Sequence, residues 1–182
     1  MEKSEQPFAV VYFASCRRTN PRRLLRLYGW LIRTLTRSGL AHVCVGVDGR
    51  VVDKTPDGIN FRSMVGMIEY PSLVAIAIVP LNSVPDVSDF IARADEKVSP
   101  WPTILKFLSR GILPRKPLTD CLATTTTILN RGDVALSSLR GCYSIGQFYK
   151  LLRRKGYATY TITHPGRFVR AVWDAGLHSV ED

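Results

Sequence analysis

The sequence predicts an α+β domain in which an antiparallel sheet packs against helices. The dipeptide Asp48-Gly49 separates two apolar segments and is a strong local signal for a β-hairpin, because both turn positions take positive φ. Short apolar runs at Phe8–Phe13 and Leu73–Val79 are rich in β-branched and aromatic residues, as buried strands are. Residues 22–37 place leucine and isoleucine at three- and four-residue steps, which indicates an amphipathic helix with a basic back.

The other elements follow from weaker patterns of the same kind. We expect strands at 8–13, 42–47, 50–54, 61–70, 73–79 and 157–163, and helices at 22–37, 86–94, 101–110, 119–130 and 145–155. Ser144 is placed to cap the last helix and Gly156 to end it. The threonine run 124–127 lowers the helix propensity of its segment, so tertiary packing must hold that helix.

Length and composition indicate a single globular domain over residues 1–182. With 46% hydrophobic and 22% charged residues, the chain is not of the disordered or fibrous type. Its longest apolar run, Leu73 to Leu81, is far shorter than the roughly 18 residues that span a bilayer, so no membrane span is expected. Residues 1–6 lack the basic head and apolar middle of a secretory signal, and we expect the mature chain to begin near Met1.

Cysteine usage indicates a reducing compartment. The chain has four cysteines, Cys16, Cys44, Cys121 and Cys142. They form neither a CxxC pair nor a disulfide framework, which indicates free thiols, as in the cytoplasm, one of which can serve catalysis. His164 and His178 have no metal-ligand spacing to any cysteine or acidic pair, so neither a metal nor another cofactor is predicted.

The chain is strongly basic. Its 25 Lys and Arg against 15 Asp and Glu give a net charge of +10, which favours association with nucleic acid, anionic lipid or another acidic partner. Seven arginines form a candidate anion-binding surface: Arg17, Arg18, Arg22, Arg23, Arg26, Arg33 and Arg37. No zinc-finger, RNA-recognition or glycine-rich phosphate-loop motif accompanies them, so binding to a phosphate backbone is favoured over sequence-specific recognition. A solvated, solubilising face is the simpler alternative.

Three residues form a candidate site for acyl transfer. His42 begins one hairpin strand, and Asp53 lies across the turn on the partner strand, diagonal to His42 and able to share its face. A carboxylate there can hold one imidazole nitrogen and fix the tautomer. Cys121 follows Asp120 at a predicted helix start, where unpaired N–H groups and the helix dipole favour a thiolate and can stabilise an oxyanion. A cysteine, a histidine and an acidic orienting group are the minimal set for this chemistry.

Each of these residues also has an ordinary structural interpretation. A histidine at a strand start is more often structural than catalytic, and Asp53 can be a solvent-facing charge. Cys121 can be a small buried hydrophobe, and Asp120 can be simply a helix cap. Cys44 shares the strand of His42 but is the weaker candidate nucleophile, because a mid-strand position offers no helix-terminal N–H donors. The combined spacing is therefore more informative than any single residue.

The order of these segments resembles the circularly permuted NlpC-like branch of the papain-like cysteine peptidase superfamily, which also contains lecithin retinol acyltransferase-type enzymes. In that branch the histidine hairpin precedes the cysteine helix. The similar segments cover roughly residues 7–160 and read FAVVYF, LLRLYGWLIRTLTRSGL, AHVCVGV with DG and VVDKT, LVAIAIVPL, TDCLATTTTIL and SIGQFYKLLRRKGY. Each motif is short, so the resemblance lies in their order.

The resemblance implies a permuted papain-like domain in which Cys121 is the nucleophile, His42 the general base and Asp53 the third, orienting residue. Family members commonly have a longer hairpin turn and a glutamate, histidine or other polar residue at the third position, so Lys54 and Thr55 stay alternatives to Asp53. The chain lacks the apolar membrane tail of some acyltransferase relatives, which favours a soluble hydrolase over an acyltransferase. Peptide, peptidoglycan and acyl substrates all suit this chemistry.

A third interpretation is a catalytically inactive domain that serves as a structural or interaction module. Small basic chains with this plan also resemble bacteriophage-encoded proteins, in which such a domain is a virion component or acts on host targets. In an inactive relative the three site residues need not converge, so their geometry distinguishes this interpretation from an enzyme.

Overall fold

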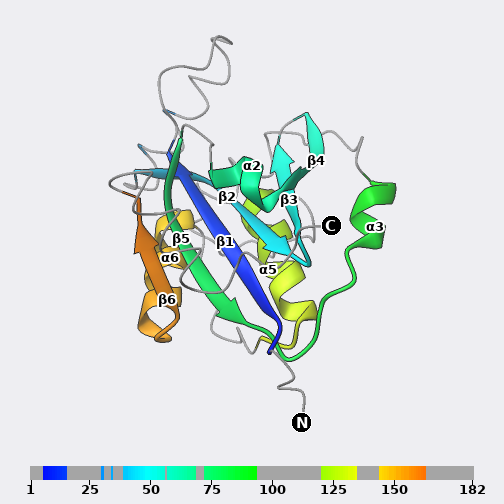
Figure 1. Cartoon of the computed structure of the whole chain (residues 1–182). Helices are drawn as coiled ribbons and strands as arrows, with labels where there is room; N and C mark the ends of the chain where they lie inside the picture. Colours follow the sequence, from blue (N-terminus) through cyan, green and yellow to red (C-terminus); the bar gives the residue numbers. More distant parts are fainter. Residues whose placement is uncertain are drawn as a thin grey trace, which may run out of the picture.

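The computed structural model describes residues 6–15, 30, 34, 39–55, 57–68, 72–93, 120–134 and 144–162. Within them, six antiparallel strands form one sheet in the order β4-β3-β2-β1-β5-β6 (Figure 1). The strands are β1 Phe8–Ser15, β2 Leu40–Val47, β3 Arg50–Thr55, β4 Gly58–Ser63, β5 Leu73–Pro80 and β6 Ala158–Thr161. The helices are α2 Met64–Ile68, α3 Ser88–Ala92, α5 Cys121–Arg131 and α6 Ile145–Arg154. The predicted α+β class is confirmed.

One predicted strand is wrong in its second half. We expected residues 61–70 to be extended, but the chain leaves β4 at Ser63 and forms the short helix α2. The hydroxyl oxygen of Ser63 accepts a hydrogen bond from the Gly66 N–H at 3.0 Å, which caps the turn. Met67 is then buried against the sheet. A short apolar run such as 64–68 is too short to show the periodicity that distinguishes a strand from one turn of helix, which explains the error.

The predicted hairpin is present, with Asp48 at φ 47° and Gly49 at φ 72°. The pairs nearest the turn are those that a two-residue loop requires, from Val47 opposite Arg50 to Val45 opposite Val52. The next two pairs that this register would give, Cys44 with Asp53 and Val43 with Lys54, do not form in the ladder. Beyond Val45 each strand pairs only with its other neighbour, β2 with β1 and β3 with β4. The hairpin therefore opens at the end that carries His42.

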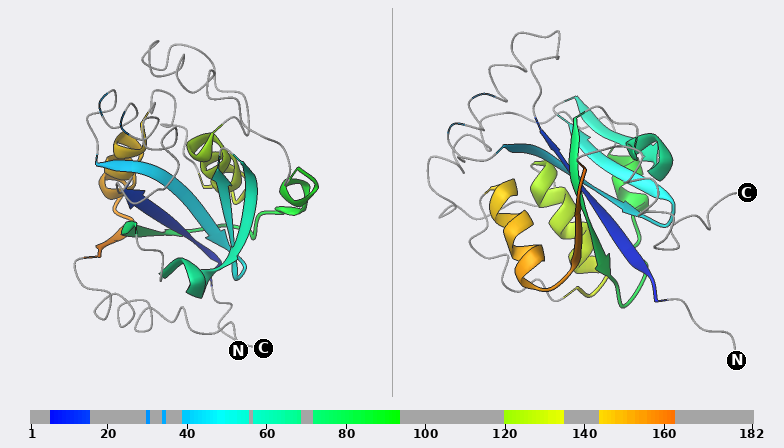
Figure 2. Two further views of the ribbon diagram at one scale, coloured as in Figure 1. Left: turned by 90° about the horizontal axis from the view of Figure 1, so that it is seen from above. Right: turned by 60° about the vertical axis from the view of Figure 1, so that its left-hand side comes forward.

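The two faces of the sheet bury different clusters. Helices α5 and α6 cover one face, and α2 lies on the other (Figure 2). The larger cluster, under α5 and α6, includes Phe13, Val45, Leu122 and Phe148. The smaller cluster on the α2 face consists of Val10, Tyr12, Cys44, Val51, Met67 and Ile76. This alternation follows from the two-residue period of a strand, which sends Val45 to one face and Cys44 to the other.

Both longer helices begin at the predicted caps. The Asp120 carboxylate accepts from the Ala123 N–H at 2.7 Å, and the Ser144 hydroxyl oxygen accepts from the Gln147 N–H at 3.2 Å. Thr124, Thr125 and Thr126 of the threonine run are buried, which confirms that packing holds α5. The hydroxyls of Thr126 and Thr127 donate to the Ala123 carbonyl.

The last turn of α5 is joined to α3. Arg131 makes two parallel hydrogen bonds to Asp89, at 2.6 and 2.7 Å, and its guanidinium lies 4.8 Å from the ring centroid of Phe90. Phe90 is fully buried in the larger cluster. A helix was predicted at 86–94, and α3 occupies its centre.

Two predicted helices fall outside this description. Residues 101–110 lie outside the described residues, as does most of 22–37, of which only Trp30 and Thr34 are described, both helical. No helix within the described ranges is long and apolar enough to cross a membrane.

We predict that Phe148→Ala lowers the free energy of unfolding by about 3–5 kcal/mol, because it leaves a cavity in the larger cluster. Phe148 is fully buried and its ring centroid lies 6.0 Å from that of Phe13. Denaturant unfolding measures the change. Val65→Ala is the control, since Val65 is 66% exposed, and we expect it to change stability by less than about 0.5 kcal/mol. Equal effects of the two substitutions would contradict this account of the core.

Candidate active site

The start of β2 positions His42 at the opened end of the hairpin. Ala14 of β1 pairs with His42 and Ser15 pairs with Leu40, so the register skips Ala41 and the strand is bulged beside the histidine. The His42 side chain is 26% exposed, whereas Val43 and Cys44 after it are buried. The imidazole is therefore held by the sheet and still open to solvent on one side.

Asp53 is the residue that contacts His42. Its Oδ1 lies 2.6 Å from Nε2 of His42, a charge-assisted hydrogen bond between two strands of the hairpin. The carboxylate is only 4% exposed. The two side chains are in contact, as we expected, although their strands do not pair at this level and the predicted diagonal register is not formed.

The alternatives to Asp53 are engaged elsewhere. Lys54 is buried and pairs with Ile59, whose side chain belongs to the larger cluster on the opposite face. The Thr55 hydroxyl donates to the Gly58 carbonyl at 3.2 Å and accepts from the Asn60 amide at 3.1 Å. Asp53 is the member of this trio that is hydrogen-bonded to the imidazole.

Cys121 is a further hydrogen-bond partner of the His42 side chain. It is the first residue of α5, is partly buried, and forms a hydrogen bond with the His42 side chain. Asp53 is bonded to Nε2 of the same ring. Helix α5 packs against both β2 and β3, and it lies in the angle between them in the left view of Figure 2. The predicted residues, 42, 53 and 121, therefore converge.

The surroundings favour an imidazolium at His42. Burial acts to lower the pKa of His42, but the hydrogen bond to Asp53 and the hydrogen bond and charge of Cys121 raise it well above the ordinary 6.5. Burial acts to raise the pKa of Asp53, but His42 and the guanidinium of Arg62 lower it below the ordinary 3.8. Near neutral pH the pair is therefore an ionised carboxylate beside a cationic ring.

Cys44 lies beneath this pair without the features of a nucleophile. It is 2% exposed, and burial, followed by the charges of Asp53 and Cys121, raises the pKa of its thiol well above the ordinary value. A buried thiol with a raised pKa is inert. Its sequence-based ranking below Cys121 agrees with this environment.

The same residues form a cluster of metal-ligand types. Single ligand atoms of His42, Cys44 and Asp53 lie within 4.8 Å of one another. Two ligands of one tetrahedral zinc ion are about 3.3 Å apart, given zinc–ligand distances near 2.0 Å. The 2.6 Å between Nε2 and Oδ1 fits a shared proton and not two ligands of one ion. The donor set does not fit a metal in this arrangement.

Sequence reasoning missed Arg62. Its Nε lies 3.4 Å from Oδ2 of Asp53, and its side chain is 42% exposed. The residue falls in the segment 61–70, which we expected to be a strand. The β3–β4 connection contains Pro56-Asp57-Gly58, a turn signal that pairs the two strands and places Arg62 diagonally across from Asp53.

Several predicted residues lie outside the described part of the chain. These are Cys16, Cys142, His164, His178 and the seven arginines Arg17, Arg18, Arg22, Arg23, Arg26, Arg33 and Arg37. A second group of basic residues, Arg153, Arg154 and Lys155, lies within the described part of the chain and is exposed at the end of α6.

Comparison of the chain with protein-family models, with curated proteins and with solved structures finds no match.

We predict that the stabilisation due to the His42–Asp53 pair is largest between about pH 3.8 and 6.5, the two ordinary pKa values. The lowered pKa of Asp53 makes its contribution present above 3.8 and lost as the pH falls through the folded-state pKa. The raised pKa of His42 makes its contribution present below 6.5 and lost as the pH rises through the folded-state pKa. Denaturant unfolding of wild type and Asp53→Asn across this range measures the difference.

The control for this experiment is Asp133→Asn. Asp133 is exposed and has φ 53°, a conformation that asparagine also tolerates. A pH-independent difference between wild type and Asp53→Asn would show that the pair is not ionised as described.

Proposed function

We propose that the protein is a cysteine-dependent hydrolase or acyltransferase with a permuted papain-like domain, acting on an amide, ester or thioester bond. The observation that supports the proposal is the position of one imidazole, which is hydrogen-bonded to a buried carboxylate and to a thiol at a helix start. In this proposal Cys121 is the nucleophile, His42 the acid and base, and Asp53 the orienting group.

The first half of the reaction forms an acyl-enzyme. The Cys121 sulfur, having lost its proton to His42, attacks the carbonyl carbon, and the carbonyl electron pair moves to oxygen. His42 then gives its proton to the leaving nitrogen, oxygen or sulfur, the carbonyl is restored and the bond to the leaving group breaks. The raised pKa of His42 suits this step, because the ring holds the proton until the leaving group needs it.

The start of α5 supplies the electrostatic stabilisation. The first backbone N–H groups of a helix have no partner within it, and here the Asp120 side chain accepts from the N–H of Ala123. The N–H groups of Cys121 and Leu122, the first two residues of α5, would hold the oxyanion. Such a donor contributes about 3–4 kcal/mol in a well-studied protease.

The second half of the reaction releases the acyl group. His42 takes a proton from water or an amine, whose oxygen or nitrogen attacks the thioester, and the Cys121 sulfur leaves as the thiolate. Water gives a hydrolase and an amine gives an acyltransferase. Peptide, peptidoglycan and lipid acyl groups remain candidate substrates, and the exposed side of His42 is where the acceptor would approach.

We predict that Cys121 is alkylated by iodoacetamide at neutral pH faster than a free thiol, and that His42→Ala lowers this rate by about tenfold or more. The physical reason is that the imidazole takes the thiol proton and its positive charge stabilises the thiolate. Mass spectrometry of the native protein, read cysteine by cysteine over a range of pH, measures the rate.

Cys44 is the internal control, since its burial should leave it unlabelled in both proteins. Asp53→Asn should lower the rate less than His42→Ala does, because it removes the orienting group and not the base. An inert Cys121, or a rate that does not depend on His42, would refute the enzyme proposal.

A second candidate function is binding of an acidic partner such as nucleic acid. A catalytically inactive bacteriophage or virion protein would have a function of this kind. The net charge of +10 favours it, and α6 contributes an exposed basic group. That group consists of Lys150, Arg153, Arg154 and Lys155. The group lies on α6 and Cys121 on α5, so the two functions are separable by mutation.

We predict that the affinity for duplex DNA falls with salt and that replacing Lys150, Arg153 and Arg154 with glutamine makes this dependence weaker. A plot of log affinity against log salt concentration has a negative slope. This slope should become shallower by about 0.9 for each phosphate that a replaced side chain neutralises in the wild-type protein. Fluorescence anisotropy at several salt concentrations measures it. Arg50→Gln is the control: it removes one positive charge from β3 and so gives the effect of losing one charge outside α6. An unchanged slope in the triple variant would exclude α6 as the binding surface.

A further inference from the structure

We propose that Arg62 is a positioning residue, which holds Oδ2 of Asp53 so that Oδ1 stays aimed at Nε2 of His42; this inference rests on the proposed function. The two oxygens of the carboxylate then have separate partners, one on β2 and one on β4. A chain of contacts runs from Arg62 through Asp53 and His42 to Cys121.

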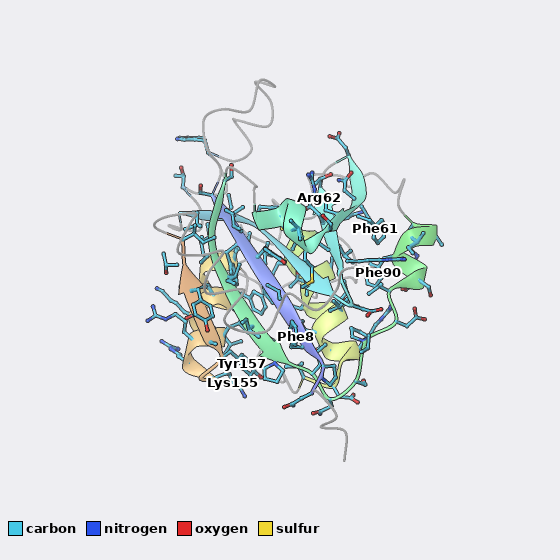
Figure 3. The ribbon with its side chains drawn as sticks, viewed as in Figure 1. Phe8, Phe61, Arg62, Phe90, Lys155 and Tyr157 are labelled. Carbon is cyan, nitrogen blue, oxygen red and sulfur yellow. The ribbon has the colours of Figure 1, made fainter. Side chains whose placement is uncertain are left out.

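The backbone fixes where Arg62 stands. In the β3–β4 ladder, Val51 is opposite Arg62 and Asp53 is opposite Asn60, so Arg62 and Asp53 are diagonal neighbours on one face. The labelled Arg62 in Figure 3 lies where β4 turns into α2. Continuous pairing of all six β3 residues with β4 keeps this spacing constant.

The hydrogen bond to His42 does not by itself fix the carboxylate. Rotation about the terminal bond of an aspartate is broad and two-fold, so one bond through Oδ1 leaves the plane free to turn. Asn60, directly opposite, donates its amide to Thr55. Arg62 approaches Oδ2 with Nε at 3.4 Å and supplies a second fixed point.

The charge of Arg62 also keeps a buried carboxylate ionised. Asp53 is 4% exposed, and burial alone would favour its neutral form. The titratable groups that face it are His42 and Cys44 from β2 and Arg62 from β4, with Cys121 of α5 coupled through His42. His42 is cationic only while it holds its proton, whereas Arg62 is cationic at every working pH.

The test compares Arg62→Gln with wild type and with Arg50→Gln. Arg50 is exposed on β3 and pairs with Val47 of the larger cluster, so its substitution removes the same charge from the opposite face of the sheet. Carbon-13 NMR follows the Asp53 carboxyl, and alkylation by iodoacetamide follows Cys121 across the acidic range.

Arg62→Gln should raise the pH at which Asp53 protonates and shift the acidic loss of Cys121 reactivity to higher pH. At about pH 5 the alkylation rate should fall several-fold relative to wild type, with a smaller change on the alkaline side. Arg62→Lys should restore part of the shift, because it keeps the charge and loses the fork geometry. Arg50→Gln should leave both curves unchanged.

Coincident curves for Arg62→Gln and Arg50→Gln would overturn the inference. Arg62→Met, which keeps an apolar stem without charge, repeats the comparison where Arg62→Gln does not fold. The Asp53 titration does not require reactivity, so an inert Cys121 in wild type refutes the proposed function while the role of Arg62 toward Asp53 is still decided.

Discussion

The contact between His42 and Asp53 is formed at the point where the hairpin stops pairing. Val45 and Val52 are the last partners of β2 and β3, and beyond them the strands separate while each keeps its other neighbour. The 2.6 Å hydrogen bond joins the separated strands through side chains where the backbone no longer does. Helix α5 packs against both strands and brings Cys121 to the imidazole. The site is thus a consequence of an interrupted ladder.

Burial of the Asp53 carboxylate at this point costs free energy, and the neighbouring cationic residues offset that cost. A carboxylate that is 4% exposed loses most of its hydration and must find partners inside the protein. Asp53 finds two cations, one on β2 and one on β4, which lower its pKa in spite of burial. His42 keeps 26% of its side chain exposed, so its charge remains partly hydrated. The buried carboxylate is therefore stabilised by contacts with both cationic side chains.

The parts of this structure that local chemistry determines could be predicted from the sequence. Asp48-Gly49 fixes the turn and the first pairs, and it brings His42 and Asp53 to the same end of the hairpin, where their side chains meet. Asp120 marks the start of α5 because its side chain can accept a backbone N–H. The end of the ladder could not be predicted in this way, since it depends on the packing of α5 against strands more than sixty residues earlier in the chain.

A purely structural ion pair is a weaker explanation of these contacts than a site. Replacing a buried pair by apolar residues is often neutral or stabilising, so stability alone gives little reason to keep a carboxylate under the sheet surface. A structural pair also has no need of an exposed imidazole side or of a thiol as a further partner of the ring. Here His42 has both, and the thiol stands at a capped helix start, where the first backbone N–H groups have no partner within the helix. Each of these features is a requirement of thiol-dependent acyl transfer, and together they favour chemistry over packing as the reason for the arrangement.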